Sequence, residues 1–151
     1  RIITDLRPSI LDHQGLWAAL EWQALEFAQS AELSLDWRMV GTEHIELPEN
    51  LAMSVFRIFQ EMLSNVARHA RATIILVTVE VSDNALNLQV RDNGCGASAE
   101  AFDAATAYGV MGMRERARHH GGCLSISSQI GQGSLFQLRI PLRHAYCGRS
   151  T

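Results

Sequence analysis

The stretch FRIFQEMLSNVARHA, residues 56–70, constrains the fold more than any other part of the sequence. At about 100° per residue, a helix here gathers an apolar stripe on one side. The stripe consists of Leu51, Val55, Ile58, Met62 and Val66. The polar residues Glu61, Asn65 and His69 recur four positions apart, and the last two fall along the edge of the stripe. The helix must therefore enter a core while something polar meets its buried edge.

The opposite sector of this helix is polar. It consists of Arg57, Gln60, Ser64 and Arg68. Charged and amide side chains gathered away from an apolar stripe are typical of a helix face in water. We therefore expect this sector to be an ordinary solvated surface.

The bulk composition indicates one globular domain. The chain has 151 residues, of which 47% are hydrophobic and 19% are charged, and its formal net charge is −3. This charge argues against a general nucleic-acid-binding role. Runs such as IILV at 74–77 are far short of the roughly 20 residues that cross a bilayer, so no direct membrane contact is expected. Cys95, Cys123 and Cys147 form no C-x-x-C pair, which favours free thiols in a reducing cytoplasm.

The periodicity predicts an alternation of helices and hairpins. Helices are expected at 12–32, 48–70 and 109–120, strands at 33–39, 73–81, 85–91, 123–128 and 134–140, and weak structure at 97–108. The turn cluster SDN between two alternating strands indicates a hairpin. Because hairpins require antiparallel pairing, we predict an α+β fold, a two-layer sandwich whose mixed, mostly antiparallel sheet is covered on one face by helices.

Three glycine-containing stretches follow the polar helix. They are RDNGCG at 91–96, YGVMGMRERA at 108–117 and IGQG at 130–133. Each alone has a structural reading, because Asp-Asn-Gly is common in turns and glycines also allow close packing. Glycines at a helix start also leave N–H groups and the positive dipole end for phosphate. The ordered set is more specific than any one stretch.

This ordered set resembles the catalytic, ATP-binding domain of two-component sensor histidine kinases, in the superfamily that includes DNA gyrase, the heat-shock ATPase and the mismatch-repair ATPase. FQEMLSNVARHA is similar to the N box, DNGCG to the first glycine box, YGVMGMRERA to the second and GQGSLF to the last, over residues 50–142. The stretches GMRERARHHGG and LRPSILDHQGLWAAL resemble the subfamily that pairs with LuxR-type response regulators.

The resemblance implies three parts of the chain. Residues 1–24 would be the end of the dimerisation helices and the helix leading from them, 25–143 the ATP-binding domain and 144–151 a disordered tail. The chain begins at Arg1, so the upstream helices with the phosphoacceptor histidine would lie outside it. This piece alone would bind nucleotide without phosphorylating itself.

The resemblance also assigns site residues. Asn65 would bind Mg²⁺, Glu61 would act as the general base or position a water, and Asp92 would accept a hydrogen bond from the adenine amino group. His69 stays open between a phosphate contact and a residue of the core edge. Residues 97–108 would form the ATP lid. The nucleotide contacts would come from Asn65, Arg68, His69, Asp92, Gly94, Gly96, Gly109, Val110, Gly112, Met113, Gly133 and Ser134.

The implied function is transfer of the γ-phosphoryl group of ATP to a histidine on the absent dimerisation helices, for relay to an aspartate of a LuxR-type response regulator. ATP and Mg²⁺ would be the cofactors, and the protein would form a homodimer through the missing helices. A cytoplasmic location is implied, with a possible inner-membrane anchor on the full-length protein. Two alternatives remain: a serine kinase of the anti-sigma-factor type, and a nucleotide-binding module without catalysis.

Overall fold

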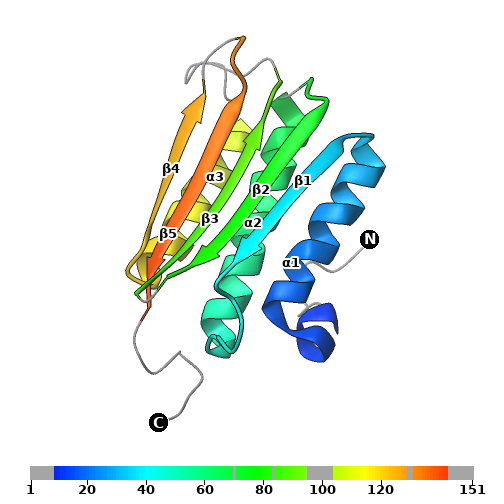
Figure 1. Cartoon of the computed structure of the whole chain (residues 1–151). Coiled ribbons are helices and arrows are strands. Elements are labelled where there is room, and N and C mark those ends of the chain that lie inside the picture. Colours follow the sequence, from blue (N-terminus) through cyan, green and yellow to red (C-terminus); the bar gives the residue numbers. More distant parts are fainter. Residues whose placement is uncertain (1–8, 70, 83, 95–103, 129–130, 143–151) are drawn as a thin grey trace.

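The computed structural model describes residues 9–69, 71–82, 84–94, 104–128 and 131–142, and Figure 1 shows the whole chain. Its elements are α1 (Ser9–Ala31), β1 (Ser34–Val40), α2 (Glu49–His69), β2 (Ile74–Val81), β3 (Ala85–Asp92), α3 (Ala104–His119), β4 (Cys123–Ser128) and β5 (Ser134–Pro141). The strands form a five-stranded sheet in the order β1-β2-β3-β5-β4. The pair β1–β2 is parallel and the other pairs are antiparallel. The predicted α+β sandwich is confirmed.

The helices form one layer and the sheet forms the other (Figure 1). The whole predicted stripe of α2 is buried, and Phe56, Phe59 and Leu63 widen it. Alternate residues of the central strands, such as Val77 and Leu88, meet α2 in the same core. Burying a large side chain of this kind contributes about 1.5–3 kcal/mol. The core therefore fixes α2 firmly against the sheet.

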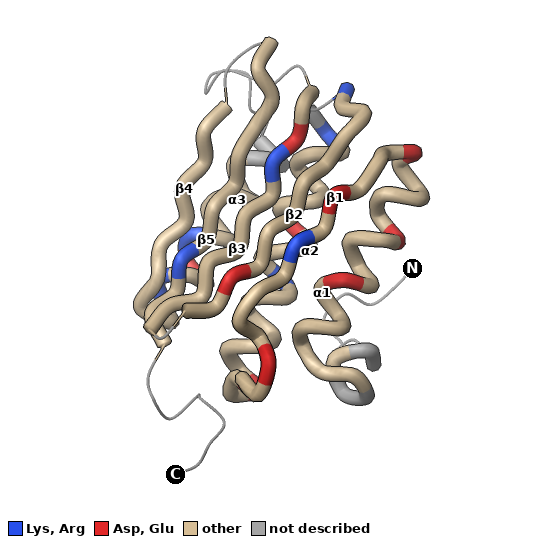
Figure 2. Tube along the Cα trace, in the orientation of Figure 1, with Lys and Arg blue, Asp and Glu red and all other residues tan. Residues whose placement is uncertain are grey.

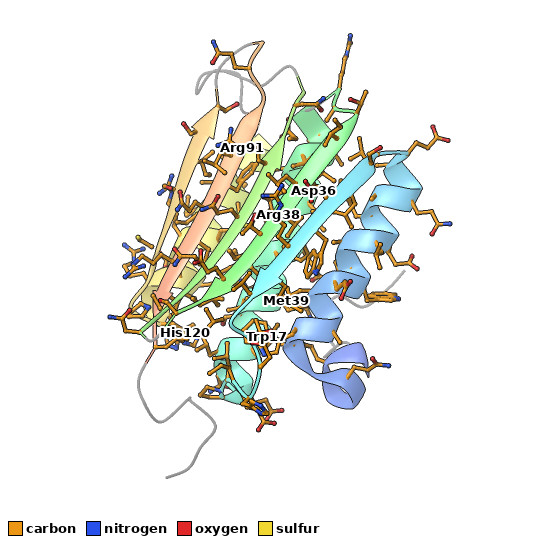
Figure 3. The ribbon with its side chains drawn as sticks, viewed as in Figure 1. Trp17, Asp36, Arg38, Met39, Arg91 and His120 are labelled. Carbon is orange, nitrogen blue, oxygen red and sulfur yellow. The ribbon has the colours of Figure 1, made fainter. Side chains whose placement is uncertain are left out.

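The other face of the sheet carries mostly polar and charged side chains, with Val40 and Ile74 exposed among them. Figure 3 labels Asp36 and Arg38 on β1 and Arg91 on β3. Arg38 donates to Asp36 at 3.2 Å, and both side chains are about half exposed or more. An exposed pair of this kind contributes little to stability.

Helix α1 continues through a break at Gly15, whose φ of 84° lies in the left-handed region. Beyond it, Leu16, Leu20 and Ala24 are buried in the core shared with α2. Trp17 donates its indole N–H to the carbonyl of Ile45 at 2.8 Å, near the lower end of the molecule in Figure 3. The predicted division at residue 24 falls within α1 and remains a prediction.

Helix α3 differs from the prediction at its start. Residues 104–108 are expected to be weakly structured, but they form the beginning of α3. The reason is that Ala104, Ala105 and Ala107 are strong helix formers. The predicted glycine stop is confirmed. Gly121 has a φ of 77°, and the N–H of Gly122 donates to the carbonyl of Ala117 at 2.8 Å, which is the Schellman arrangement that ends helices.

Candidate functional site

The site residues gather at one end of the sandwich, the upper end in Figure 1. The last turns of α2, the end of β3 and the starts of α3 and β5 all lie there. This arrangement follows from the topology, because β3 and α2 run in one direction while β5 and α3 run in the other. Asn65, Asp92 and Ser134 are therefore brought to the same end although they are far apart in sequence.

Asn65 is the most unusual residue of α2. It is 2% exposed, and neither its Oδ1 nor its Nδ2 has a hydrogen-bond partner in the structure. Leaving a buried polar group unpaired costs about 1–3 kcal/mol. An amide held in this state is prepared for a ligand, and its oxygen suits a hard cation such as Mg²⁺. The sequence predicts that something polar meets this edge of α2, and among the described residues nothing is hydrogen-bonded to the amide.

Asp92 ends β3 and is also buried, with 4% exposure. Its Oδ1 accepts a hydrogen bond from the N–H of Gly94 at 2.7 Å, while its Oδ2 is buried without a partner. Burial raises the pKa of the Asp92 carboxyl, and hydrogen bonds from the backbone N–H groups of Gly94 and Ser134 oppose that rise. One oxygen is thus fixed by the backbone and the other is left to accept from a ligand.

The last glycine stretch lies directly against Asp92. Asp92 pairs with Ser134 in the sheet register, and Gly133, with a φ of 78°, is so close that a Cβ would overlap the Asp92 carbonyl oxygen. The Ser134 hydroxyl lies 2.9 Å from that of Ser128. The structure therefore brings Gly94 and Ser134 to the Asp92 carboxylate and Gly133 to the Asp92 backbone.

Asn93 supports this corner, and sequence reasoning missed its role. Its Oδ1 accepts from the N–H groups of Thr73 and Ile74 at 2.9 and 3.0 Å, and its Nδ2 donates to the Thr73 hydroxyl at 2.9 Å. These bonds tie the end of β3 to the start of β2. Asn is common in such turns, which was the only sequence signal for it.

Glu61, one turn before Asn65 on α2, lies in a groove between α2 and α3 with a volume of about 790 Å³. We call this the α2–α3 groove. Its α2 wall consists of Met53, Arg57, Gln60, Glu61 and Ser64. Its α3 wall consists of Tyr108, Gly109, Gly112, Met113 and Arg116. The prediction of a solvated face is wrong for Arg57, Gln60 and Ser64, which are half-buried because α3 packs beside this sector and α1 meets Gln60.

Gly109 and Gly112 lie inside α3 and not at its start. The prediction that their N–H groups are free for phosphate is therefore wrong, because only the first four N–H groups of a helix lack partners. Gly109 instead leaves room for Glu61, since a Cβ there would overlap the Glu61 carboxylate. Nothing lies within 4 Å of a Cβ placed at Gly112.

The remaining predicted site residues differ in burial and in location. Val110 is half-buried, Met113 is buried in the core and in the groove wall, and Arg68 is exposed near the end of α2. The side chain of His69 and all of Gly96 lie outside the described residues, as does most of the predicted lid. Among the described residues there is no cluster of three or more His, Cys, Asp or Glu that could hold a metal.

Comparison with known proteins gives the family. The model of the family described as histidine kinase-, DNA gyrase B-, and HSP90-like ATPase matches residues 50–144. The chain belongs to this ATPase family. Members of this family bind ATP, and the unpartnered side-chain oxygens of Asn65 and Asp92 lie within the matched region.

Several relatives are similar over nearly the whole chain. Sensor histidine kinase LiaS of Bacillus subtilis is 31% identical over 141 residues, which cover 93% of this chain and 38% of that protein. The signal transduction histidine-protein kinase/phosphatase DegS of Brevibacillus brevis is 30% identical over 146 residues, 94% of this chain and 36% of that protein. The ATPase-family chain thus spans less than two fifths of either relative.

A further relative and a solved structure agree. The oxygen sensor histidine kinase NreB of Staphylococcus carnosus is 29% identical over 138 residues, which cover 91% of this chain and 40% of that protein. The histidine kinase domain of the blue-light activated kinase EL346 from Erythrobacter litoralis superposes with a TM-score of 0.66 and 19% identity, over 90% of this chain and 66% of that one. This likeness supports the ATPase fold. No helix in the described part of the chain is long and apolar enough to span a membrane.

Proposed function

We propose that this chain is the ATP-binding catalytic domain of a sensor histidine kinase, which transfers the γ-phosphoryl group of ATP to a histidine on an upstream dimerisation segment. The relatives named above are all described as histidine kinases. The observation that carries the proposal is the pair of buried side chains with unused oxygens, Asn65 and Asp92, at one end of the sandwich.

Asp92 would read the base. Its unpartnered Oδ2 would accept a hydrogen bond from the amino group of adenine. Guanine presents a carbonyl oxygen at the corresponding place, and two acceptors facing each other in a buried site are unfavourable. The same carboxylate would therefore select ATP over GTP.

Asn65 would hold the metal. Its amide oxygen would bind Mg²⁺, which favours oxygen ligands and usually binds through few protein groups plus the phosphates. When bound, the ion neutralises charge on the phosphates. Arg68, exposed at the end of α2, and the helix-terminal His69 would serve the phosphate side.

Glu61 would act on the accepting group. Its carboxylate opens onto the α2–α3 groove one turn before Asn65, where an incoming imidazole can reach it. There Glu61 would orient the imidazole by accepting the hydrogen bond of its N–H, leaving the other ring nitrogen to attack. Gly109, which has no side chain, leaves room for the carboxylate there.

The wider assignments are part of this proposal. The accepting helices would form a homodimer, and the phosphoryl group would pass to a LuxR-type response regulator. The domain would be cytoplasmic, and the full-length protein would be anchored in the inner membrane. The test is phosphorylation of the protein extended upstream by these helices, with γ-labelled ATP and Mg²⁺. Acid-labile, base-stable label on histidine that disappears in Glu61→Ala and Asn65→Ala variants is expected. ATP binding without label on histidine would favour a non-catalytic module.

A further inference from the structure

The α2–α3 groove continues past Glu61, away from the nucleotide end. The helices are antiparallel: Glu61 lies against Gly109, and Ser54, about two turns earlier in α2, lies 3.0 Å from the ring Nε2 of His120. From Met53 to Ser64 the α2 wall is about 16 Å long at 1.5 Å per residue. The groove is therefore long enough for about three turns of another helix.

Two arginines line this extension. Arg57 is one turn before Glu61 on α2, and Arg116 is two turns after Gly109 on α3. Arg57 donates to Gln60 Oε1 at 3.1 Å, and Gln60 in turn donates to Gln23 of α1 at 3.3 Å. These bonds hold the Arg57 guanidinium in position beside the groove.

Arg116 differs from its neighbours on α3. Arg114 donates to the carbonyl of Leu124 at 2.9 Å, and Arg118 pairs with Glu115 at 2.9 Å. Both of those cations thus serve contacts within the domain, whereas Arg116 is exposed and directed to the groove wall. In Figure 2 the charged residues of described α1 are all acidic, whereas the second half of α3 has the acidic Glu115 among basic residues.

The shape of the groove suits a helix. Gly109 and Gly112 give the α3 wall little side-chain bulk, and space is open above Gly112. Tyr108, 72% exposed, and Met53 supply apolar contact area beside it. A helix laid in a groove uses apolar anchors together with a few charged contacts.

We infer that the α2–α3 groove receives an acidic helical segment of protein, the one that carries the accepting histidine, and that Arg57 and Arg116 bind its carboxylates. The inference rests on the proposed function. It places acidic side chains of that segment about one turn or more from the histidine, on the side away from the nucleotide, because Arg57 is one turn from Glu61. Carboxylates are the partners that guanidinium groups bind most specifically.

The test uses the upstream-extended protein with Arg116→Glu and Arg57→Gln, and Arg118→Glu as the matched control on the same helix. We expect ATP affinity within twofold of wild type in all three. Transfer to histidine should fall about tenfold in Arg116→Glu at low salt, with a smaller effect at high salt. Arg118→Glu should transfer normally. An acid-to-arginine change in the segment should restore transfer to Arg116→Glu.

Two results would overturn the inference: transfer at the wild-type rate in Arg116→Glu, or an equal loss in Arg118→Glu. If wild type binds ATP but labels no histidine, the proposed function fails. Hydrogen exchange of the extended protein then tests separately whether the upstream segment occupies the α2–α3 groove. Protection of residues 53–64 by the upstream segment, lost in Arg116→Glu, would then support acidic docking. Absence of protection would refute it.

Discussion

The carboxylate of Glu61 lies against the backbone of Gly109, across the α2–α3 groove, so closely that no side chain fits between them. Gly112, one turn along the same helix, faces open space. The two glycines therefore have different roles although both belong to one sequence box. Gly109 leaves the space that the carboxylate of Glu61 occupies, and Gly112 keeps the groove open.

This difference predicts opposite results for two alanine variants. Both should gain helix propensity, worth about 1 kcal/mol in an exposed helix interior. Gly112→Ala should show this gain as greater stability in thermal unfolding, and it should still bind nucleotide. Gly109→Ala should gain less, because its Cβ displaces the Glu61 carboxylate, and transfer in the extended protein should fall at least about tenfold. Equal stabilisation and equal transfer in the two variants would refute the assigned role of Gly109.

Asn65→Ala should separate stability from binding. Because the variant removes two buried polar atoms without partners, the free energy of unfolding without ligand should rise, by about 1 kcal/mol. Stabilisation by ATP with Mg²⁺ should vanish. Denaturant unfolding with and without nucleotide measures both, and Ser64→Ala, beside it on α2, is the control that should keep the ligand effect. A destabilised Asn65→Ala protein that still responds to Mg²⁺ would contradict this account.

Gly133→Ala should be much more harmful than Gly131→Ala. Both glycines have positive φ, 78° and 83°, so each alanine carries a backbone cost of about 1 kcal/mol or more. Only at Gly133 would the Cβ also overlap the Asp92 carbonyl oxygen. We expect a loss of more than about 2 kcal/mol in unfolding free energy and weakened ATP binding for Gly133→Ala alone. Similar unfolding curves for the two variants would exclude the close contact.

Titration of Asp92 should contribute to the pH dependence of the free energy of unfolding of the domain without ligand. Its pKa is raised above the ordinary value of 3.8 by burial, so the folded state holds this proton more strongly than the unfolded chain does. Its contribution to stability is therefore complete below about pH 3.8 and is lost as pH rises through the raised pKa. Asp92→Asn should remove this decline. ATP binding should change in the opposite direction, weakening in acid as the carboxylate is protonated. A variant with an unchanged pH profile of unfolding would contradict the assignment.

Much of the fold could be predicted because local periodicity in the sequence indicates where its helices and strands lie. The stripe of α2 repeats at helical spacing, and the strands alternate at period two. The start of α3 differs from the prediction, which places the helix from 109 while the structure begins it at Ala104. Helix propensity summed over that turn favours the alanines.

The site was predictable only in part. Asp92, Gly133 and Ser134 could be named from their boxes, but their contact depends on the β3–β5 register. The groove could not be predicted, because whether Arg57 and Gln60 face water or another helix depends on where α3 packs. Asn93 was indistinguishable from an ordinary turn residue until its bonds to Thr73 and Ile74 were seen.

The most direct test is calorimetric titration of this chain with ATP and Mg²⁺, beside GTP and the Asp92→Asn variant. The account predicts Mg²⁺-dependent binding of ATP, no measurable binding of GTP at the same concentrations, and weakened ATP binding in a variant that unfolds as cooperatively as wild type. Equal binding of ATP and GTP, or undiminished ATP binding in folded Asp92→Asn, would contradict the claim that the buried carboxylate of Asp92 receives the adenine.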